Sequence, residues 1–102
     1  MIDTKTGLDS DVKRKIVGVL LGLFPGARIY LYGSRARGTH YERSDIDIAI
    51  DLGKKLNFVD VGEARDMFRE SNIQYSIDVV DLHGIPDYLK EEILKEGIVW
   101  SE

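Results

Sequence analysis

A Gly-Ser pair followed at a fixed distance by an Asp-Ile-Asp run constrains this chain more than any other feature of its sequence. Gly33 and Ser34 follow the apolar stretch Arg28–Tyr32, ten residues come next, and Asp45 and Asp47 then lie two positions apart. The second run alternates acidic or small side chains with isoleucine. Because side chains two apart in a strand share one face, we expect the isoleucines to be buried and the aspartates to lie together on the opposite face.

Two aspartates on one strand face repel each other, so a cation or water must offset their charge. Asp45 and Asp47 offer carboxylate oxygens, the ligands that Mg²⁺ prefers, and Mg²⁺ usually binds one or two carboxylates together with substrate phosphates. A third aspartate, Asp78, lies on the polar face of residues 74–80, which also alternate. If the two strands are neighbours, Asp78 completes a set of three candidate metal ligands; otherwise it only flanks a strand.

The Gly-Ser pair permits a sharp turn at the end of the first strand. Exposed amides there and the Ser34 hydroxyl are candidates for holding the phosphates of a nucleotide. Arg35 and Arg37 follow directly, and their guanidinium groups are candidates for pairing with phosphate oxygens or with a leaving pyrophosphate. The alternatives are an ordinary turn and solvated arginines.

A P-loop is the competing phosphate motif, because Gly33 and Gly38 have the spacing of its two glycines. Thr39 and His40 stand where that loop requires Lys and then Ser or Thr, and no long apolar helix begins there, so we exclude it. His40 and His83 have no second histidine at ligand spacing, so we expect surface or capping roles for them rather than metal binding.

The chain has 102 residues, a formal net charge of -4 and no cysteine. Its length predicts a single domain, residues 1–102, with one core and no separate substrate domain. The acidic balance argues against general nucleic-acid binding, and the lack of cysteine excludes disulfides and thiolate zinc sites. No apolar run approaches the ~20 residues of a membrane span and Met1 begins no signal peptide, so we expect no membrane association and a cytoplasmic location.

Apolar periodicity predicts the element order α-β-β-α-β-α, and therefore a small mixed sheet covered by helices in an α/β or α+β fold. The predicted strands are 28–32, 45–52 and 74–80, and the predicted helices begin at Asp9 or Ser10, near Asp60 in a capping box with Glu63, and at Pro86. Apolar Ile98, Val99 and Trp100 could serve the core, a partner groove or a homo-oligomer. Asp51 and Asp81, at strand ends, are expected to be solvated.

Together these residues resemble the minimal nucleotidyltransferases of the DNA polymerase β-type nucleotidyltransferase superfamily, whose motif is Gly-Ser, ten residues and Asp-x-Asp. The resemblance covers nearly the whole chain and includes the arginine-containing stretch after the Gly-Ser pair. It implies a polymerase β-like fold, two Mg²⁺ ions bound by Asp45 and Asp47 with Asp78 binding the catalytic ion, and a triphosphate held by Gly33 and Ser34. It also implies that an acceptor hydroxyl attacks the α-phosphorus of a nucleotide, by analogy ATP, and that pyrophosphate leaves.

The short length further resembles the antitoxins encoded beside HEPN ribonuclease toxins, which lack added domains. In that group the enzyme adenylylates a tyrosine of its toxin, and the two proteins often form a stable complex. We therefore expect a Mg²⁺-dependent adenylyltransferase that acts on a HEPN-type toxin. The alternatives are a non-catalytic antitoxin that binds its toxin, and transfer to a small molecule or an RNA end. Arg35 and His40 also match the Arg-His motif of HEPN ribonucleases, but that motif belongs to all-helical domains, so we treat the match as chance.

Overall fold

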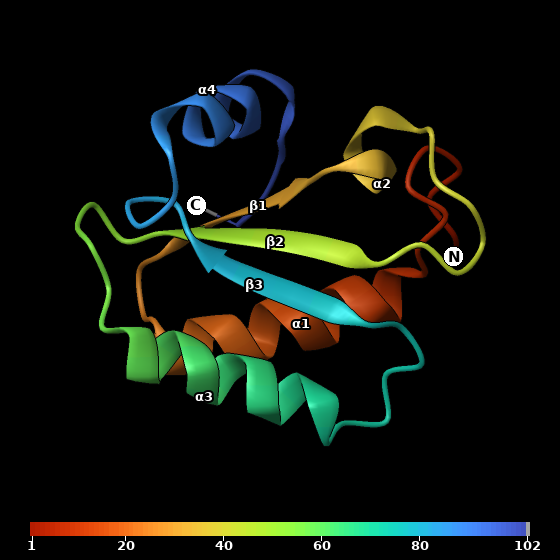
Figure 1. The fold of residues 1–102 in the computed structure, drawn as a ribbon. Coiled ribbons are helices and arrows are strands. Elements are labelled where there is room, and N and C mark those ends of the chain that lie inside the picture. The colour runs from red at the N-terminus through yellow and green to blue at the C-terminus, as the bar shows by residue number, and fades with distance from the viewer. Residues whose placement is uncertain (102) are drawn as a thin grey trace.

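The computed structural model describes residues 1–101, which form four helices and four strands. In chain order these are α1 (Ser10–Leu23), β1 (Arg28–Tyr32), α2 (Ser34–Arg37), β2 (Ile46–Asp51), α3 (Phe58–Arg69), β3 (Ile77–Asp81), α4 (Asp87–Glu96) and β4 (Ile98–Ser101). The strands form a mixed sheet in the order β3-β2-β1-β4, with β2 and β3 parallel and the other pairs antiparallel. Helices α1 and α3 lie on one side of this sheet and α4 on the other (Figure 1). The predicted small mixed sheet covered by helices is confirmed.

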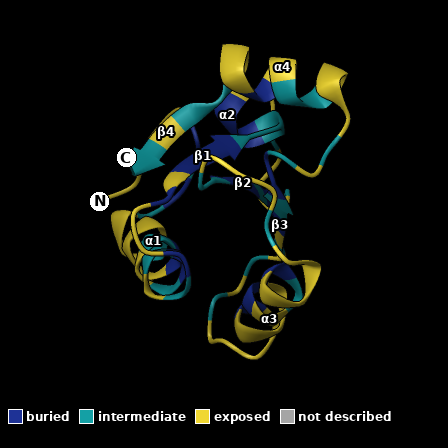
Figure 2. Ribbon diagram, turned by 90° about the vertical axis from the view of Figure 1, so that its left-hand side faces the viewer, coloured by how far each residue is buried: buried dark blue, intermediate teal, exposed yellow. Residues whose placement is uncertain are grey.

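The alternation along β2 divides the sheet into two faces. Ile46, Ile48 and Ile50 are fully buried in the main core, which α1 and α3 complete, and Figure 2 shows the buried strands between helices whose outer surfaces are exposed. On the opposite face Ala49 joins a smaller cluster with Ile93 of α4. Asp47 lies on this second face, where its carboxylate is half-buried.

Helix α1 begins as expected, because the Asp9 side chain accepts a hydrogen bond of 2.9 Å from the Asp11 N–H. Ile16 and Leu20, four residues apart, are its buried positions and give it one apolar face. Within residues 1–101 no helix combines the length and apolar character that crossing a membrane requires.

Two predicted boundaries were wrong. Helix α3 begins at Phe58 rather than near Asp60, because the Asn57 side chain accepts a 2.8 Å hydrogen bond from the Val59 N–H and caps the helix three residues earlier. Strand β3 begins at Ile77 rather than at residue 74, since its partner Ile46 is the first residue of β2 and, among residues 1–101, no strand extends beside residues 74–76.

Two elements were not predicted. The turn after Gly33 contains the short helix α2, and the segment after Gly97 is the strand β4, which pairs with β1. Ile98 and Trp100 pack against the main core, whereas Val99 is 40% exposed. A four-residue strand is too short for apolar alternation to identify it from the sequence.

The cap of α3 gives a direct test of the revised boundary. We expect Asn57→Ala to lower the free energy of unfolding by about 1 kcal/mol, because the Val59 N–H loses its acceptor. We expect Asp60→Ala to cost no more than about 0.3 kcal/mol, because Asp60 is exposed and alanine is a better helix former. Urea denaturation of both variants measures the difference. A larger loss of stability for Asp60→Ala would instead support the predicted capping box at Asp60.

Candidate active site

Tyr32, Asp47 and Asp78 form a row across three adjacent strands. Tyr32 of β1 is the register partner of Asp47 in β2, and Asp47 is the register partner of Asp78 in β3. Register partners project to the same face of a sheet from strands about 4.8 Å apart, so these side chains are neighbours. Asp45 lies two residues before Asp47, on the exposed chain that leads into β2. We call the three aspartates the carboxylate row.

The electrostatics of Asp47 reflect these neighbours. Burial raises the pKa of Asp47 from 3.8 to about 6, with further increases from the charges of Asp78 and Asp45, while Arg37 opposes the rise. The structure therefore brings the three aspartates close enough to interact, which one sequence could only suggest. A carboxylate with this pKa is mostly ionised at neutral pH and becomes protonated below about pH 6, where protons would compete with a cation at the same place.

Tyr32 belongs to the site although the sequence analysis did not single it out. Burial raises the pKa of Tyr32 to about 12, and the charges of Asp47 and Asp78 add to the effect. Its hydroxyl therefore stays protonated at neutral pH and can donate a hydrogen bond at the end of the carboxylate row. Only the strand register identifies this neighbour, and register cannot be read from a single strand.

Gly33 places the turn directly against Asp47. Its φ of +77° lies in the left-handed region that side chains disfavour, and a Cβ at this position would overlap the Asp47 carboxylate. Ser34 follows as the first residue of α2, where amide groups have no acceptor within the helix. The predicted phosphate turn and the carboxylate row are thus in contact.

Arg35 does not join this site. Its side chain is 1% exposed, and its guanidinium donates to the carbonyls of Thr6 at 2.7 Å, Glu42 at 2.9 Å and Ser44 at 3.1 Å. The guanidinium also lies 4.8 Å from the centre of the Tyr75 ring. These carbonyls occupy all three nitrogens of the guanidinium, so the predicted phosphate contact of Arg35 is corrected. Arg35 instead connects the N-terminal segment to the loop before β2 by hydrogen bonds.

Arg37 lies at the edge of the site. It is 44% exposed, and its Nη1 is 3.6 Å from Glu92 and 3.9 Å from Glu96, both on α4. Its charge lowers the pKa of Asp47, which places it within electrostatic reach of the carboxylate row. Of the two predicted arginines, only Arg37 is positioned to meet a bound anion.

Arg65 of α3 is a site residue that the sequence analysis missed. Its Nε donates to the Val79 carbonyl at 2.9 Å and lies 3.8 Å from Oδ1 of Asp78. A signal was present, because Arg65 shares the helical stripe of the buried residues Val61, Ala64 and Phe68. An arginine among buried apolar residues requires polar partners, which here are the Val79 carbonyl and the Asp78 carboxylate.

Asp51 and Asp81 are not simply solvated, as the sequence analysis expected. Asp81 is buried, and its carboxylate accepts hydrogen bonds from the N–H groups of Leu56 at 2.7 Å and His83 at 3.0 Å. His83 Nε2 lies 2.6 Å from Asp51. These contacts hold the turn after β3, and neither residue belongs to the carboxylate row.

The donors of the carboxylate row suit a hard divalent cation. Among residues 1–101 no three acidic or histidine side chains, the carboxylate row included, lie close enough together to hold a metal ion by themselves. Mg²⁺ does not require such a cluster, since it is usually held by one or two carboxylates and completed by substrate phosphates and water. Burial and the neighbouring charges of Asp78 and Asp45 both raise the pKa of Asp47 and are only partly opposed by Arg37, so the residues fit a cation that arrives with a phosphorylated substrate.

Comparison with known proteins points to one family. Residues 25–102 match the family described as "Polymerase beta, Nucleotidyltransferase". A protein of Methanocaldococcus jannaschii, named as a suspected protein adenylyltransferase, is 32% identical over 91 residues, which cover 87% of this chain and 94% of that protein.

Solved structures share the fold. A crystal structure of a toxin-antitoxin complex with AMP-PNP aligns with a TM-score of 0.76 and 29% identity, over 87% of this chain and 72% of the other. A complex of tri-AMPylated Shewanella oneidensis HEPN toxin with MNT antitoxin aligns with a TM-score of 0.73 and 24% identity, over 92% and 72% of the two chains. The predicted polymerase β-like fold is confirmed.

Repulsion in the carboxylate row predicts that Asp47→Asn stabilises the metal-free protein at neutral pH. The pKa of Asp47 is raised in the folded state, so the folded protein gains stability as the pH falls through about 6 towards 3.8 and loses it as the pH rises. We expect the variant to be more stable by about 1 kcal/mol at pH 7.5, after allowance for solvent screening, and the difference to vanish below pH 3.8.

Urea denaturation at several pH values in the presence of a chelator measures this difference. Glu63→Gln removes one exposed carboxylate from α3 and serves as the control, with no pH-dependent gain expected. Equal or lower stability of Asp47→Asn at pH 7.5 would contradict the repulsion.

Burial of Arg35 predicts a structural effect of its replacement. We expect Arg35→Met to lower the free energy of unfolding by about 3 kcal/mol or more, because three backbone carbonyls lose a charged donor. Arg14→Met, which breaks only an exposed ion pair with Asp11, should cost about 0.5 kcal/mol. If Arg35→Met keeps its stability but loses nucleotide affinity, the original phosphate assignment was right.

Proposed function

Because the chain belongs to the polymerase β-type nucleotidyltransferase family and is a nucleotidyltransferase, we propose that it transfers AMP from ATP, with two Mg²⁺ ions, to a tyrosine of a HEPN-type toxin. Contact between the Gly33 turn and Asp47, within a row of three interacting aspartates, is the observation that carries this proposal. It supplies phosphate-binding and cation-binding groups at one place. The chain would then act as an antitoxin by modifying its partner.

Each residue of the site has a distinct task in this reaction. Asp45, Asp47 and Asp78 would hold the two ions, which when bound neutralise the triphosphate and polarise the reacting oxygens. Gly33 and Ser34 hold the β- and γ-phosphates through backbone amides and the serine hydroxyl. Because Gly33 has no side chain, these phosphates reach the turn without displacing Asp47.

Arg37 is proposed to bind the leaving pyrophosphate. Its present partners, Glu92 and Glu96, are exposed side chains at distances of 3.6 and 3.9 Å, and such pairs are weak. A pyrophosphate carries more charge than either glutamate, and two of its oxygens can accept parallel hydrogen bonds from the planar guanidinium. Arg37 can therefore leave the two glutamates of α4 and bind the pyrophosphate at a small cost in free energy.

The transfer itself is a substitution at the α-phosphorus. The acceptor hydroxyl oxygen forms a bond to this phosphorus, the bond to the bridging oxygen of the β-phosphate breaks, and pyrophosphate leaves. The hydroxyl proton is released to solvent. Catalysis then depends on positioning and on charge stabilisation, which the carboxylate row and its ions supply together.

Similarity to toxin-antitoxin structures supports a protein acceptor. One similar complex contains AMP-PNP and another a tri-AMPylated HEPN toxin, so both nucleotide and modified partner occur among the structural neighbours. We propose the cytoplasm as the place of reaction, since it supplies ATP and Mg²⁺ to both proteins.

Transfer of label from α-³²P-ATP to any HEPN-type protein encoded beside this chain tests the proposal. We expect a Mg²⁺-dependent labelled band, with mass spectrometry placing AMP on a tyrosine. Asp47→Ala should reduce labelling by roughly 10³-fold or more, because a ligand of both ions is lost. Glu63→Ala, an exposed change on α3, is the control and should label normally.

Two outcomes would favour the alternatives. If Asp47→Ala still silences the toxin and no nucleotide gives label, the chain is an antitoxin that acts by binding alone. If pyrophosphate is released only when a small hydroxylated compound is supplied, the acceptor is not a protein.

A further inference from the structure

A groove extends from Asp78 along the outer edge of the sheet. Strand β3 is at the end of the strand order, and two cavities of about 350 Å³ and about 460 Å³ lie along residues 74–78. Gln74, Tyr75 and Ser76 line both cavities, so the two flank the same segment. We name this surface the edge groove and define it by Arg43, Arg65, Arg69, Gln74, Tyr75 and Ser76.

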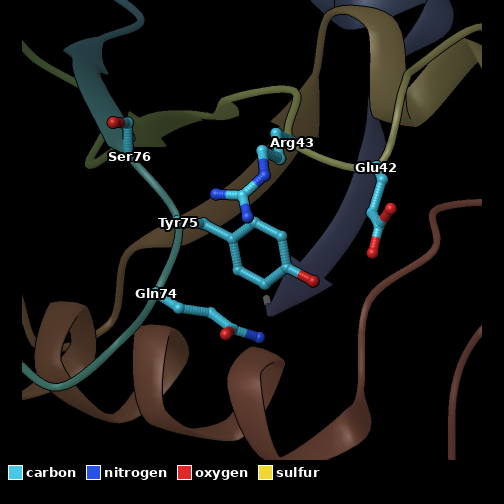
Figure 3. A pocket seen from close by; sticks show the side chains of 5 residues that line it. All are labelled: Glu42, Arg43, Gln74, Tyr75 and Ser76. Carbon is cyan, nitrogen blue, oxygen red and sulfur yellow. The ribbon is translucent and has the colours of Figure 1, made fainter.

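The edge groove has a preformed wall. Figure 3 shows one of its cavities, where Arg43 comes from the loop before β2 and Gln74, Tyr75 and Ser76 come from the segment before β3. The Tyr75 ring stacks on the buried Arg35 guanidinium at 4.8 Å, which fixes the ring in place. Such a wall needs little reordering when a ligand binds.

The groove lies on the side of the carboxylate row from which an acceptor must approach. The Gly33 turn contacts Asp47, so the triphosphate and its leaving pyrophosphate belong at the β1 side. In-line substitution places the attacking oxygen opposite the leaving group. Opposite the turn the row ends at Asp78, which lines the edge groove.

The charged side chains around the edge groove indicate which class of ligand fits it. Arg43, Arg65 and Arg69 border it, whereas the whole chain carries a net charge of -4. Arg65 and Arg69 are one turn apart on α3, where Arg65 lies 3.8 Å from Asp78 and Arg69 forms an exposed ion pair with Asp66 at 3.0 Å. Within residues 1–101 Arg43 forms no ion pair, and the exposed pair of Arg69 is weak enough to exchange for another acidic side chain. Glu42 and Asp78 also line the two cavities, which disfavours a continuous polyanion such as RNA. A segment with separated acidic side chains fits this pattern better.

The edge of β3 suits an extended peptide. Edge strands bind extended segments through backbone hydrogen bonds, and within residues 1–101 no strand covers the outer side of β3. Arg65 already occupies the Val79 carbonyl at 2.9 Å, so the accessible part of this strand edge begins at Ile77. Residues 74–76, which line both cavities, lead into it as extended chain outside the strand.

We infer that the edge groove binds the acceptor as an extended, acidic segment of the partner protein, which presents its tyrosine hydroxyl beside Asp78. The inference rests on the proposed function and specifies where and by what chemistry the acceptor docks. Arg43 and Arg69 pair with acidic residues that flank the tyrosine. Arg65 guides the segment while holding Asp78 at the reacting end.

Nuclear magnetic resonance of the full ¹⁵N-labelled chain tests this assignment. The chain is first saturated with Mg²⁺ and α,β-methylene ATP, whose α–β bridge cannot be cleaved. Three synthetic peptides are then added: a tyrosine flanked by glutamates, a tyrosine flanked by lysines, and a phenylalanine flanked by glutamates. We expect the acidic tyrosine peptide to shift the amide signals of Gln74, Tyr75, Ser76 and Arg69, and to bind at least about tenfold more tightly than the lysine peptide.

A matched pair of charge reversals sharpens the test. Arg43→Glu should weaken the acidic peptide by about tenfold while changing the affinity for the nucleotide far less. Lys15→Glu introduces the same charge change on exposed α1 and should leave peptide affinity within about twofold. With the phenylalanine peptide we expect binding but no transfer when ATP replaces the analogue.

Other results would overturn the assignment while leaving the proposed function intact. These are equal binding of the lysine peptide, no peptide binding at all, peptide-induced shifts confined to α1 or β4, and displacement of the peptide from residues 74–76 by a short RNA. Shifts at residues 74–76 from the nucleotide analogue alone would make the groove a nucleobase site. Failure of the analogue to bind in any form would instead contradict the proposed function.

Discussion

The register between β2 and β3 is the constraint on which the site depends. Ile46 pairs with Ile77 and Asp47 with Asp78, so the apolar residues that fill the core also fix the two aspartates on the other face. A slip of one residue would send Asp78 to the core side, where burial of its charge would be costly. Core packing therefore maintains a repulsive arrangement that the protein alone would not favour.

The same arrangement predicts that ligand binding and stability are coupled at this site. Asp47 has a raised pKa because burial and like charges act on it together. In the proposed reaction, a cation that enters with a nucleotide would offset this repulsion. The proposal therefore implies that relief of this repulsion contributes to the affinity for the phosphorylated substrate.

Long-range backbone contacts hold the loops around the site. Arg35 follows the Gly-Ser turn, but its hydrogen bonds reach carbonyls 29, 7 and 9 residues away in sequence, at Thr6, Glu42 and Ser44. Its guanidinium also supports Tyr75, at the wall of the edge groove. One buried arginine therefore links the Gly33 turn, the loop before β2 and the segment before β3.

The features that could be predicted from the sequence are those that depend on the spacing of residues close together in the chain. The first helix, the strand Arg28–Tyr32 and the isoleucine alternation of β2 follow from spacing alone, and the offset between Gly33 and Asp47 indicated the chemistry. Features that depend on tertiary partners could not be predicted. An arginine after a Gly-Ser turn gives the same sequence pattern whether its side chain binds phosphate or, like that of Arg35, buried backbone carbonyls. Arg65 and Tyr32 enter the site only through strand register and helix packing.

Paramagnetic broadening by Mn²⁺ with ATP is the most direct measurement of the site. Mn²⁺ replaces Mg²⁺ at oxygen ligands and weakens the amide signals of nearby residues in the ¹⁵N-labelled chain. We expect the strongest loss at Gly33, Asp47 and Asp78, with little effect at the His83 end of the sheet. Strongest broadening around Asp51 and His83, or broadening that Asp47→Ala leaves unchanged, would contradict a metal-nucleotide site at the carboxylate row.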